Sequence, residues 1–314
     1  MAKERGTVFN FVLRIKKPTM HIPDGFLSPA VWGASDALAV PAVALMARRA
    51  RGGIEDRNIP LLGVMGAFVF AAQMINFPVG PGTSGHLVGG ALLAIALGPS
   101  AAAMVMTAIV SIQALIFQDG GIIALGANIF NMAIVGVIVG YLPYRLLGRK
   151  WRSAAIFTGG ALSVLASASF ALAELIASGV PMPRRLLLLS MGFFLVNALV
   201  EGAITLAAVR AIERLVPGGI RGPGEAGSRA IGMVAAVSIV LAAAGILIAS
   251  ADPDGIQKMA AAHAPKWMHA PLAGYRFHDI ASPWLGKSVA GLAGIVLIFA
   301  ACSIAARFAR RRSA

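Results

Sequence analysis

The amino-acid sequence predicts an all-α, polytopic transmembrane protein. Of its 314 residues, 58% are hydrophobic and only 13% are charged, whereas about a quarter of the residues in soluble domains are charged. The mean hydropathy is +0.80. Apolar runs near the roughly 20 residues needed to cross a bilayer recur along the whole chain. These observations exclude a soluble globular domain.

Nine apolar segments are expected to be helices, of which about eight or nine lie in the membrane. They cover residues 26–47, 60–78, 86–98, 99–117, 121–146, 154–178, 186–210, 229–250 and 286–306. The third is too short to cross upright, and Gly98-Pro99 cuts it from the fourth. We therefore expect a short broken or re-entrant helix whose N-terminus carries His86. Broken backbone at membrane depth is tolerated only where it is buried in protein or lines a cavity, so this region is a candidate site.

The basic residues indicate how the segments are oriented. If segment 26–47 runs from outside to inside, four Lys or Arg residues fall in each of three inside loops and four in the C-terminal tail, against six outside. Short cytoplasmic loops carry this excess of positive charge. The net charge of +14 thus reflects topology and contact with membrane lipid, and no nucleic-acid partner is expected. The C-terminus is predicted to be cytoplasmic.

Residues 1–19 break this pattern. Five basic residues would lie outside, directly before the first span: Lys3, Arg5, Arg14, Lys16 and Lys17. A secretory signal is not indicated, because Asn10 interrupts the apolar core Val8–Val12 and no small-residue cleavage site follows. Either translation starts at Met20 or the segment is removed. We expect a start at Met20, which leaves 1–19 as an extension absent from the mature chain.

A start at Met20 would create a chelating N-terminus. The free amine, the backbone amide of His21 and its Nδ1 would close two fused rings on one metal ion. A fourth nitrogen could come from His86, which ends the stretch Gly80–His86, GPGTSGH. Planar nitrogen coordination is preferred by Ni(II) and Cu(II). The single cysteine, Cys302, excludes an intrachain disulfide and a metal–thiolate site built on several cysteines.

Polar residues near these histidines are candidates for the pocket. Thr83 and Ser84 would either orient a ligating imidazole or cap the following helix. Asp24 is expected in a turn with Pro23 and Gly25 and is compatible with a role in seating the N-terminal segment. Uncharged polar side chains at membrane depth either wall the pocket or bridge helices. These are Gln73, Asn76, Gln113, Asn128 and Asn131.

Other ionisable residues are expected to be structural. The carboxylates within the spans are Asp36, Glu174 and Glu201, and each is predicted to make an interhelical contact. An external segment contains His263, His269, His278 and Asp279, whose spacing matches no firm ligand pattern. These residues could pre-collect metal, but the segment is expected to serve transport rather than to hold metal.

Three stretches identify a family. MHIPDGFL (20–27), QMINFPVGPGTSGHLVGG (73–90) and SIQALIFQDGGIIALGANIFNM (111–132) resemble the substrate-capture membrane subunit of nickel and cobalt energy-coupling-factor transporters, the CbiM/NikM family. There, the N-terminal amine, the amide and imidazole of the next histidine, and a histidine in the GTSGH loop hold the metal. The resemblance assigns these roles to Met20, His21 and His86. It covers about 20–215 as a metal-capture domain.

The remainder, 216–314, resembles the small two-helix accessory subunit (PDGLE or CbiN-like), because an external loop at 251–285 contains Pro253-Asp254-Gly255. The resemblance thus implies a fused, non-enzymatic component of an ATP-driven importer in the bacterial cytoplasmic membrane, with its metal site facing outside. Its implied partners are a transmembrane coupling subunit and two ATP-binding cassette ATPases. Ni²⁺ or Co²⁺ is cargo, and no cofactor is expected.

Rival functions are weaker. Gly82–Gly85 fits a rhomboid-type Gly-x-Ser-Gly, but no later span supplies the histidine base that such a serine needs. Ala281–Ser288 resembles a phosphate-binding loop but has alanine in place of the first glycine and precedes a membrane span. The alternative kept is an ion-coupled secondary transporter or channel for divalent cations, although paired carboxylates or an inverted repeat are not evident.

Overall fold

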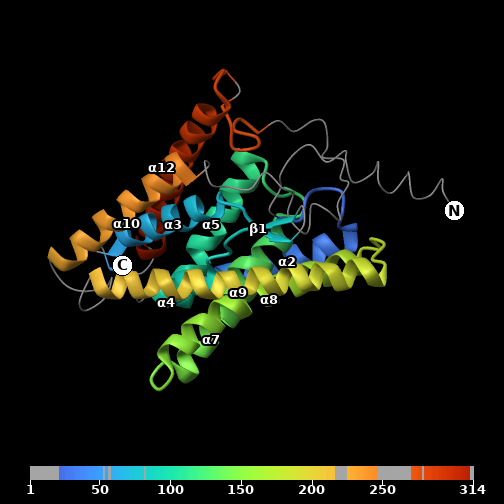
Figure 1. Ribbon diagram of the computed structural model, residues 1–314, viewed down its shortest axis with the longest axis horizontal. Helices are drawn as coiled ribbons and strands as arrows, with labels where there is room; N and C mark the ends of the chain where they lie inside the picture. Colours follow the sequence, from blue (N-terminus) through green and yellow to red (C-terminus); the bar gives the residue numbers. More distant parts are fainter. Residues whose placement is uncertain are drawn as a thin grey trace.

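The computed structural model describes residues 21–51, 54–55, 58–80, 83–215, 225–245, 270–277 and 279–311 (Figure 1). Met20, the extension 1–19 and the external histidines His263, His269 and His278 lie outside these residues. Most of the external loop 251–285 lies outside them as well.

The described chain is almost entirely helical, which confirms the predicted fold class. Its helices are α2 (Pro29–Ala50), α3 (Ile59–Gln73), α4 (Gly90–Leu97), α5 (Pro99–Phe117), α6 (Leu125–Ile129), the π-helix η3 (Phe130–Gly136), α7 (Val137–Leu147), α8 (Arg152–Ala177), α9 (Arg184–Leu215), α10 (Glu225–Ala244) and α12 (Pro283–Arg311). Each predicted apolar segment corresponds to one of these helices or, for 121–146, to the continuous run α6–η3–α7.

Six of these segments are long and apolar enough to cross a membrane. They are α2, α5, the run Leu125–Leu147, α8, α9 and α12. The apolar helices α3 and α10 are shorter. The described chain is thus that of a multi-pass membrane protein.

The prediction for the third segment is wrong in its details. Instead of a helix starting at His86, the chain forms an antiparallel hairpin of β1 (Phe77–Gly80) and β2 (Thr83–Gly85), and α4 begins only at Gly90. Gly89 adopts φ 77°, a left-handed conformation that favours glycine, and directly precedes the helix. His86 therefore lies in the irregular segment between the hairpin and α4. The hairpin also ends α3 earlier than the predicted residue 78.

The short helix α4 lies at the centre of the protein. Leu92 and Leu93 are fully buried, and α4 turns into α5 at Gly98, where φ is 84° and ψ is 153°. A helix of this length is viable at membrane depth because protein surrounds it. The expected break at Gly98-Pro99 is confirmed.

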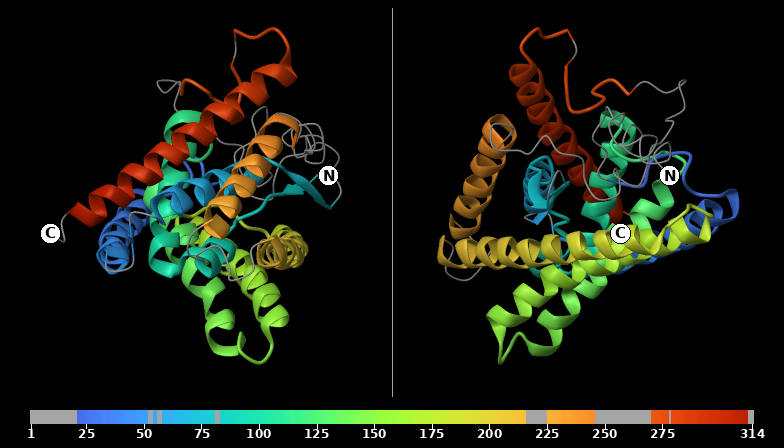
Figure 2. Two further views of the ribbon diagram at one scale, coloured as in Figure 1. Left: turned by 90° about the vertical axis from the view of Figure 1, so that its left-hand side faces the viewer. Right: turned by 45° about the vertical axis from the view of Figure 1, so that its right-hand side comes forward.

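Helices α10 and α12 pack against α3, and α12 also contacts α5 (Figures 1 and 2). Glycines allow the close approach. A methyl group at Gly66 of α3 would lie 3.0 Å from Sγ of Cys302, and one at Gly291 of α12 would lie 3.3 Å from Cβ of Ala242. Small residues at helix contacts are the usual means of association in membranes. The C-terminal helices are thus part of the same packed body as α3 and α5.

The carboxylate of Glu174 on α8 confirms its predicted interhelical role. It accepts hydrogen bonds from Ser35 Oγ on α2 at 3.0 Å and from Asn131 Nδ2 on η3 at 2.6 Å. Asp36 of α2 packs against Gly126 of α6, which is also a contact between helices. Glu201 differs from these two carboxylates, because its partners are backbone N–H groups before α4.

Candidate metal centre

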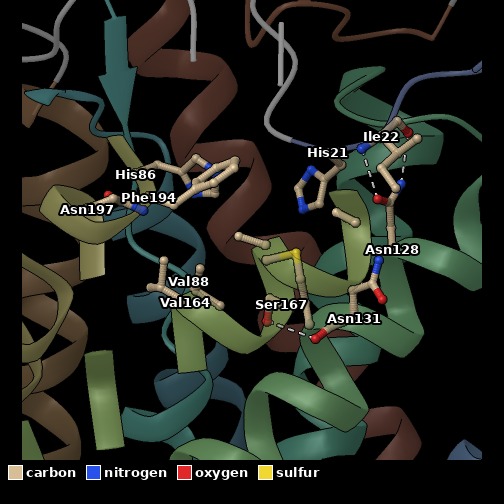
Figure 3. Close-up of a pocket in the computed structure, with 13 residues that line it drawn as sticks. His21, Ile22, His86, Val88, Asn128, Asn131, Val164, Ser167, Phe194 and Asn197 are labelled. Carbon is tan, nitrogen blue, oxygen red and sulfur yellow. Dashed lines mark hydrogen bonds between the residues drawn. The ribbon is translucent and has the colours of Figure 1, made fainter. Parts of the chain in front are cut away.

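Two imidazoles face one cavity near the N-terminal segment. The ring centroids of His21 and His86 are 6.3 Å apart and their planes are tilted by 39°. They border a cavity of about 70 Å³ from opposite sides (Figure 3). Its lining also includes two of the predicted pocket residues, Asn128 and Asn131. The structure therefore brings together residues that lie 65 positions apart in the sequence.

The tautomer of His86 suits a metal ligand. Its Nδ1 lies 2.9 Å from the carbonyl oxygen of Leu87. A carbonyl can only accept, so Nδ1 carries the proton and Nε2 carries the lone pair. Ligating histidines are commonly oriented in this way through their second ring nitrogen.

His21 is buried beside a carboxylate that the sequence reasoning missed. Its Nδ1 lies 3.5 Å from Oδ1 of Asp119, while its Nε2 is buried and has no hydrogen-bond partner among the described residues. Asp119 follows α5 in a polar break, Gln118-Asp119-Gly120-Gly121, between two apolar runs. That is the same kind of signal that identified His86, and it could have identified Asp119.

The N-terminal segment is fastened to the loop that follows Asp119. The backbone N–H of Ile22 donates to Asn128 Oδ1 at 2.9 Å, and Asn128 Nδ2 donates back to the Ile22 carbonyl at 3.0 Å. Asp24 accepts backbone N–H groups of three residues, at 3.1, 2.7 and 3.3 Å: Ile122, Ile123 and Ala124. Gly25, with φ 90°, turns the chain after this contact, in accordance with the predicted turn. Asp24 and Asn128 thus seat His21.

We expect Asp24→Ala to loosen this seat. The change leaves three backbone donors without their carboxylate, and an unsatisfied buried donor costs about 1–3 kcal/mol. Limited proteolysis of the purified protein should show faster cleavage near residues 21–28. Asp279→Ala, an exposed aspartate, is the matched control. Equal cleavage rates in the two variants would contradict this role.

The other predicted pocket residues whose side chains the structure describes do not line the cavity. Gln73 on α3 donates to the Val88 carbonyl at 2.8 Å and accepts from Gln113 Nε2 at 2.9 Å, so it supports the backbone after His86. Ser84 is buried in β2, and Asn76 lies between α3 and β1. The side chain of Thr83 lies outside the part of the structure that is described.

Glu201 on α9 holds the same backbone from the opposite side. Its two carboxylate oxygens each accept one N–H at 2.8 Å, from Val88 and Gly89, and the side chain is fully buried. The sequence prediction of a contact between helices is therefore wrong for Glu201, because its partners are the backbone N–H groups of the two residues directly before α4. Phe194 and Asn197 of α9 line the cavity, a wall that the sequence reasoning also missed.

Side chains alone do not complete a metal site here. Among the described residues, no group of three or more His, Cys, Asp or Glu is placed to hold a metal ion. Within this part of the chain, His21 and His86 are the two histidines that line one cavity.

Comparison with known proteins assigns the chain to a family. Residues 21–218 match the family described as cobalt uptake substrate-specific transmembrane region, CbiM, and residues 228–311 match the PDGLE domain. A relative from Archaeoglobus fulgidus, named as a fused nickel transport protein, is 37% identical over 297 residues, which is 93% of this chain and 99% of the relative. The cobalt transport protein CbiM of Streptomyces coelicolor is 41% identical over 136 residues, covering 42% of this chain and 57% of that protein.

Solved structures agree with the fold. A crystal structure of a truncated transition metal transporter is 35% identical, with a TM-score of 0.55, and covers 62% of this chain and 99% of its own. A second transition metal transporter is 34% identical, with a TM-score of 0.56, and covers 63% of this chain and 94% of its own. The chain therefore belongs to the CbiM family of cobalt uptake substrate-specific transmembrane regions, followed here by a PDGLE domain.

Proposed function

We propose that the protein captures Ni²⁺ or Co²⁺ outside the cytoplasmic membrane, as the substrate-binding component of an ATP-driven energy-coupling-factor importer. The observation that carries this proposal is the pair His21 and His86 facing one cavity beside Asp119. Family membership in cobalt uptake and the nickel and cobalt names of the relatives support it.

The fused chelate rings fix the order of the ligands around the proposed ion. The amine, the amide nitrogen and Nδ1 of His21 take three successive corners of a square, so His86 takes the fourth corner, next to Nδ1 and opposite the amide nitrogen. The ring centroids of His21 and His86 are 6.3 Å apart, and both imidazoles line the one cavity in which such an ion would lie.

The two remaining corners are proposed to be the amine of Met20 and the amide nitrogen of His21. This requires that Met20 be the first residue of the active protein, and it makes residues 20–215 the capture domain. An all-nitrogen square suits nickel, whereas a relative from Streptomyces coelicolor is named as a cobalt transport protein. The chelate also requires Nδ1 of His21, which is the nitrogen beside Asp119.

Energy is proposed to come from partner subunits, a transmembrane coupling protein and two ATP-binding cassette ATPases, with residues 216–314 acting as the accessory domain. The orientation expected from the basic loops puts the metal site outside and the C-terminus inside. The rival is an ion-coupled transporter that needs no ATPase.

Uptake of radioactive nickel and cobalt separates the two functions. Cells expressing the chain from Met20 together with the coupling protein and ATPases should accumulate metal, and a Walker-motif variant of the ATPases should abolish accumulation. Full uptake without the ATPases, lost when the ion gradient is collapsed, would establish the ion-coupled rival instead.

A further inference from the structure

A short segment from the accessory part of the chain packs against the end of α5, just before Asp119. Residues 270–277, which precede α12, form backbone hydrogen bonds with the end of α5. The N–H of Leu272 donates to the Ile116 carbonyl, and the N–H of Gly274 donates to the Phe117 carbonyl, both at 3.0 Å. The segment is thus fixed two residues before Asp119.

Aromatic packing holds the next residue, Tyr275, in a defined place. Its ring stacks on Phe117 with centroids 4.8 Å apart and planes at 19°, and lies 6.1 Å from Phe70. Its φ is 55°, a conformation that is uncommon and costly for a residue with a side chain. Such conformations persist where the surrounding contacts overdetermine them, as the backbone bonds and the stacking do here.

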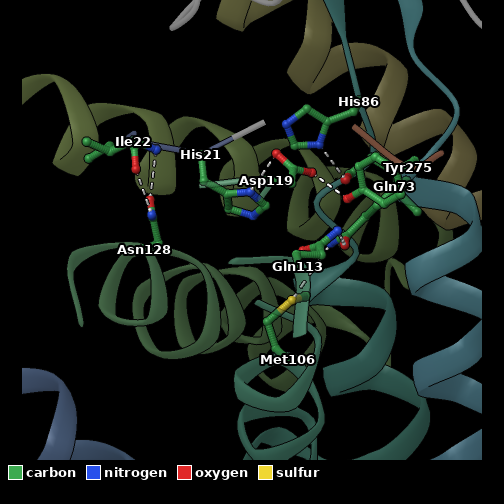
Figure 4. A network of polar contacts seen from close by, with 10 residues as sticks. His21, Ile22, Gln73, His86, Met106, Gln113, Asp119, Asn128 and Tyr275 are labelled. Atoms are coloured by element: carbon green, nitrogen blue, oxygen red, sulfur yellow. Dashed lines mark hydrogen bonds and ion pairs between the residues drawn. The ribbon is translucent and has the colours of Figure 1, made fainter. Parts of the chain in front are cut away.

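The hydroxyl of Tyr275 reaches the carboxylate beside the metal-site histidine. It donates a hydrogen bond to Oδ2 of Asp119, whose Oδ1 lies 3.5 Å from Nδ1 of His21 (Figure 4). Burial and the neighbouring carboxylate raise the pKa of Tyr275, so the hydroxyl keeps its proton and donates. The Asp119 carboxylate is therefore hydrogen-bonded to Tyr275 through Oδ2, while Oδ1 faces His21.

We propose that Tyr275 is a positioning residue of the metal centre, which holds the Asp119 carboxylate beside His21. This inference rests on the proposed function and adds to it a role for the accessory part of the chain in metal holding. With Nδ1 of His21 on the ion, Asp119 cannot also accept a hydrogen bond from that nitrogen. A carboxylate fixed beside it instead supplies negative charge close to the cation. Sequence reasoning expected this part to serve transport alone, because its histidines are scattered.

Removing one oxygen atom tests the proposal. Tyr275→Phe keeps the ring that stacks on Phe117 but cannot hold Asp119. With purified full-length protein begun at Met20, we expect Ni²⁺ affinity to fall about tenfold or more, as is typical when a group that supports a metal ligand is lost. The electron paramagnetic resonance spectrum of bound Cu²⁺ should also shift, because that spectrum reports ligand geometry.

Tyr144→Phe is the matched control. The Tyr144 hydroxyl accepts a hydrogen bond from Arg152 at 2.9 Å, on α7 and away from the cavity lining. This variant should keep the wild-type affinity and spectrum. If Tyr275→Phe behaves like Tyr144→Phe in both measurements, the proposal is overturned.

A double-mutant cycle tests whether Tyr275 acts through Asp119. Asp119→Asn should weaken Ni²⁺ binding, and adding Tyr275→Phe to it should have little further effect, since coupled residues are not additive. Independent, multiplying effects would overturn the proposal. If Tyr275→Phe is not recovered as folded protein, wild-type affinity in Asp119→Asn overturns it by itself.

His86→Ala in the same assay separates this inference from the proposed function. If wild-type protein binds no Ni²⁺, or His86→Ala binds it equally well, the metal site itself fails. If His86→Ala alone loses the metal, the site stands and the Tyr275 comparison decides the inference.

Discussion

Replacing His86 by alanine should reduce the nickel and cobalt that purify with the protein, begun at Met20, to background. The change removes one ligand of the proposed square while the helices stay intact, because His86 lies in the irregular segment between β2 and α4. His21→Ala should have the same result. Loss of a direct ligand should exceed the roughly 10–100-fold loss in affinity that follows removal of a supporting group. Metal content by mass spectrometry is the measurement.

One alanine inserted between Met20 and His21 examines the chelate itself. The insertion keeps every side chain but breaks the two fused rings, so bound metal should again fall to background. The control is an alanine inserted between Arg149 and Lys150, in the turn between α7 and α8. Near-wild-type metal content in the first variant would show that His21 binds as an ordinary side chain or not at all.

The second large effect is expected at Glu201. Glu201→Ala leaves the N–H groups of Val88 and Gly89 buried without their acceptors, at about 1–3 kcal/mol each. Because these residues directly follow His86, the variant should unfold at lower temperature and also hold less metal. Thermal unfolding in detergent and metal content are the two measurements. Glu201→Gln keeps one carbonyl acceptor, so it should lower the unfolding temperature and the metal content less than Glu201→Ala does.

Glu213→Ala is the control on the same helix. Glu213 forms an ion pair with Arg152, and both side chains are partly exposed to solvent. Such pairs contribute about 0–1 kcal/mol, so this variant should resemble the wild type. If the two alanine variants of α9 show equal stability and equal metal content, Glu201 does not hold the loop.

The membrane segments could be predicted because hydropathy and segment length are local properties of the chain. Every expected segment corresponds to a helix or a continuous run of helices in the structure, and the expected break at Gly98 separates α4 from α5. The hairpin before α4 was not foreseen. Its residues, FPVG and TSG, are too few for alternation to be visible, and its form depends on buried partners such as Glu201 and Gln73.

The sequence by itself determined the membrane class of this protein and its two candidate histidines, because His86 stands in a polar break between apolar runs and His21 follows the methionine at which translation is expected to start. Only the tertiary structure decided which groups support them. Asp119 is 98 positions from His21, Glu201 is 113 from Val88, and Tyr275 is 156 from Asp119. No local pattern encodes these contacts, because they arise when separate helices pack together. At that point a buried carboxylate or N–H must find its partner wherever in the chain that partner lies.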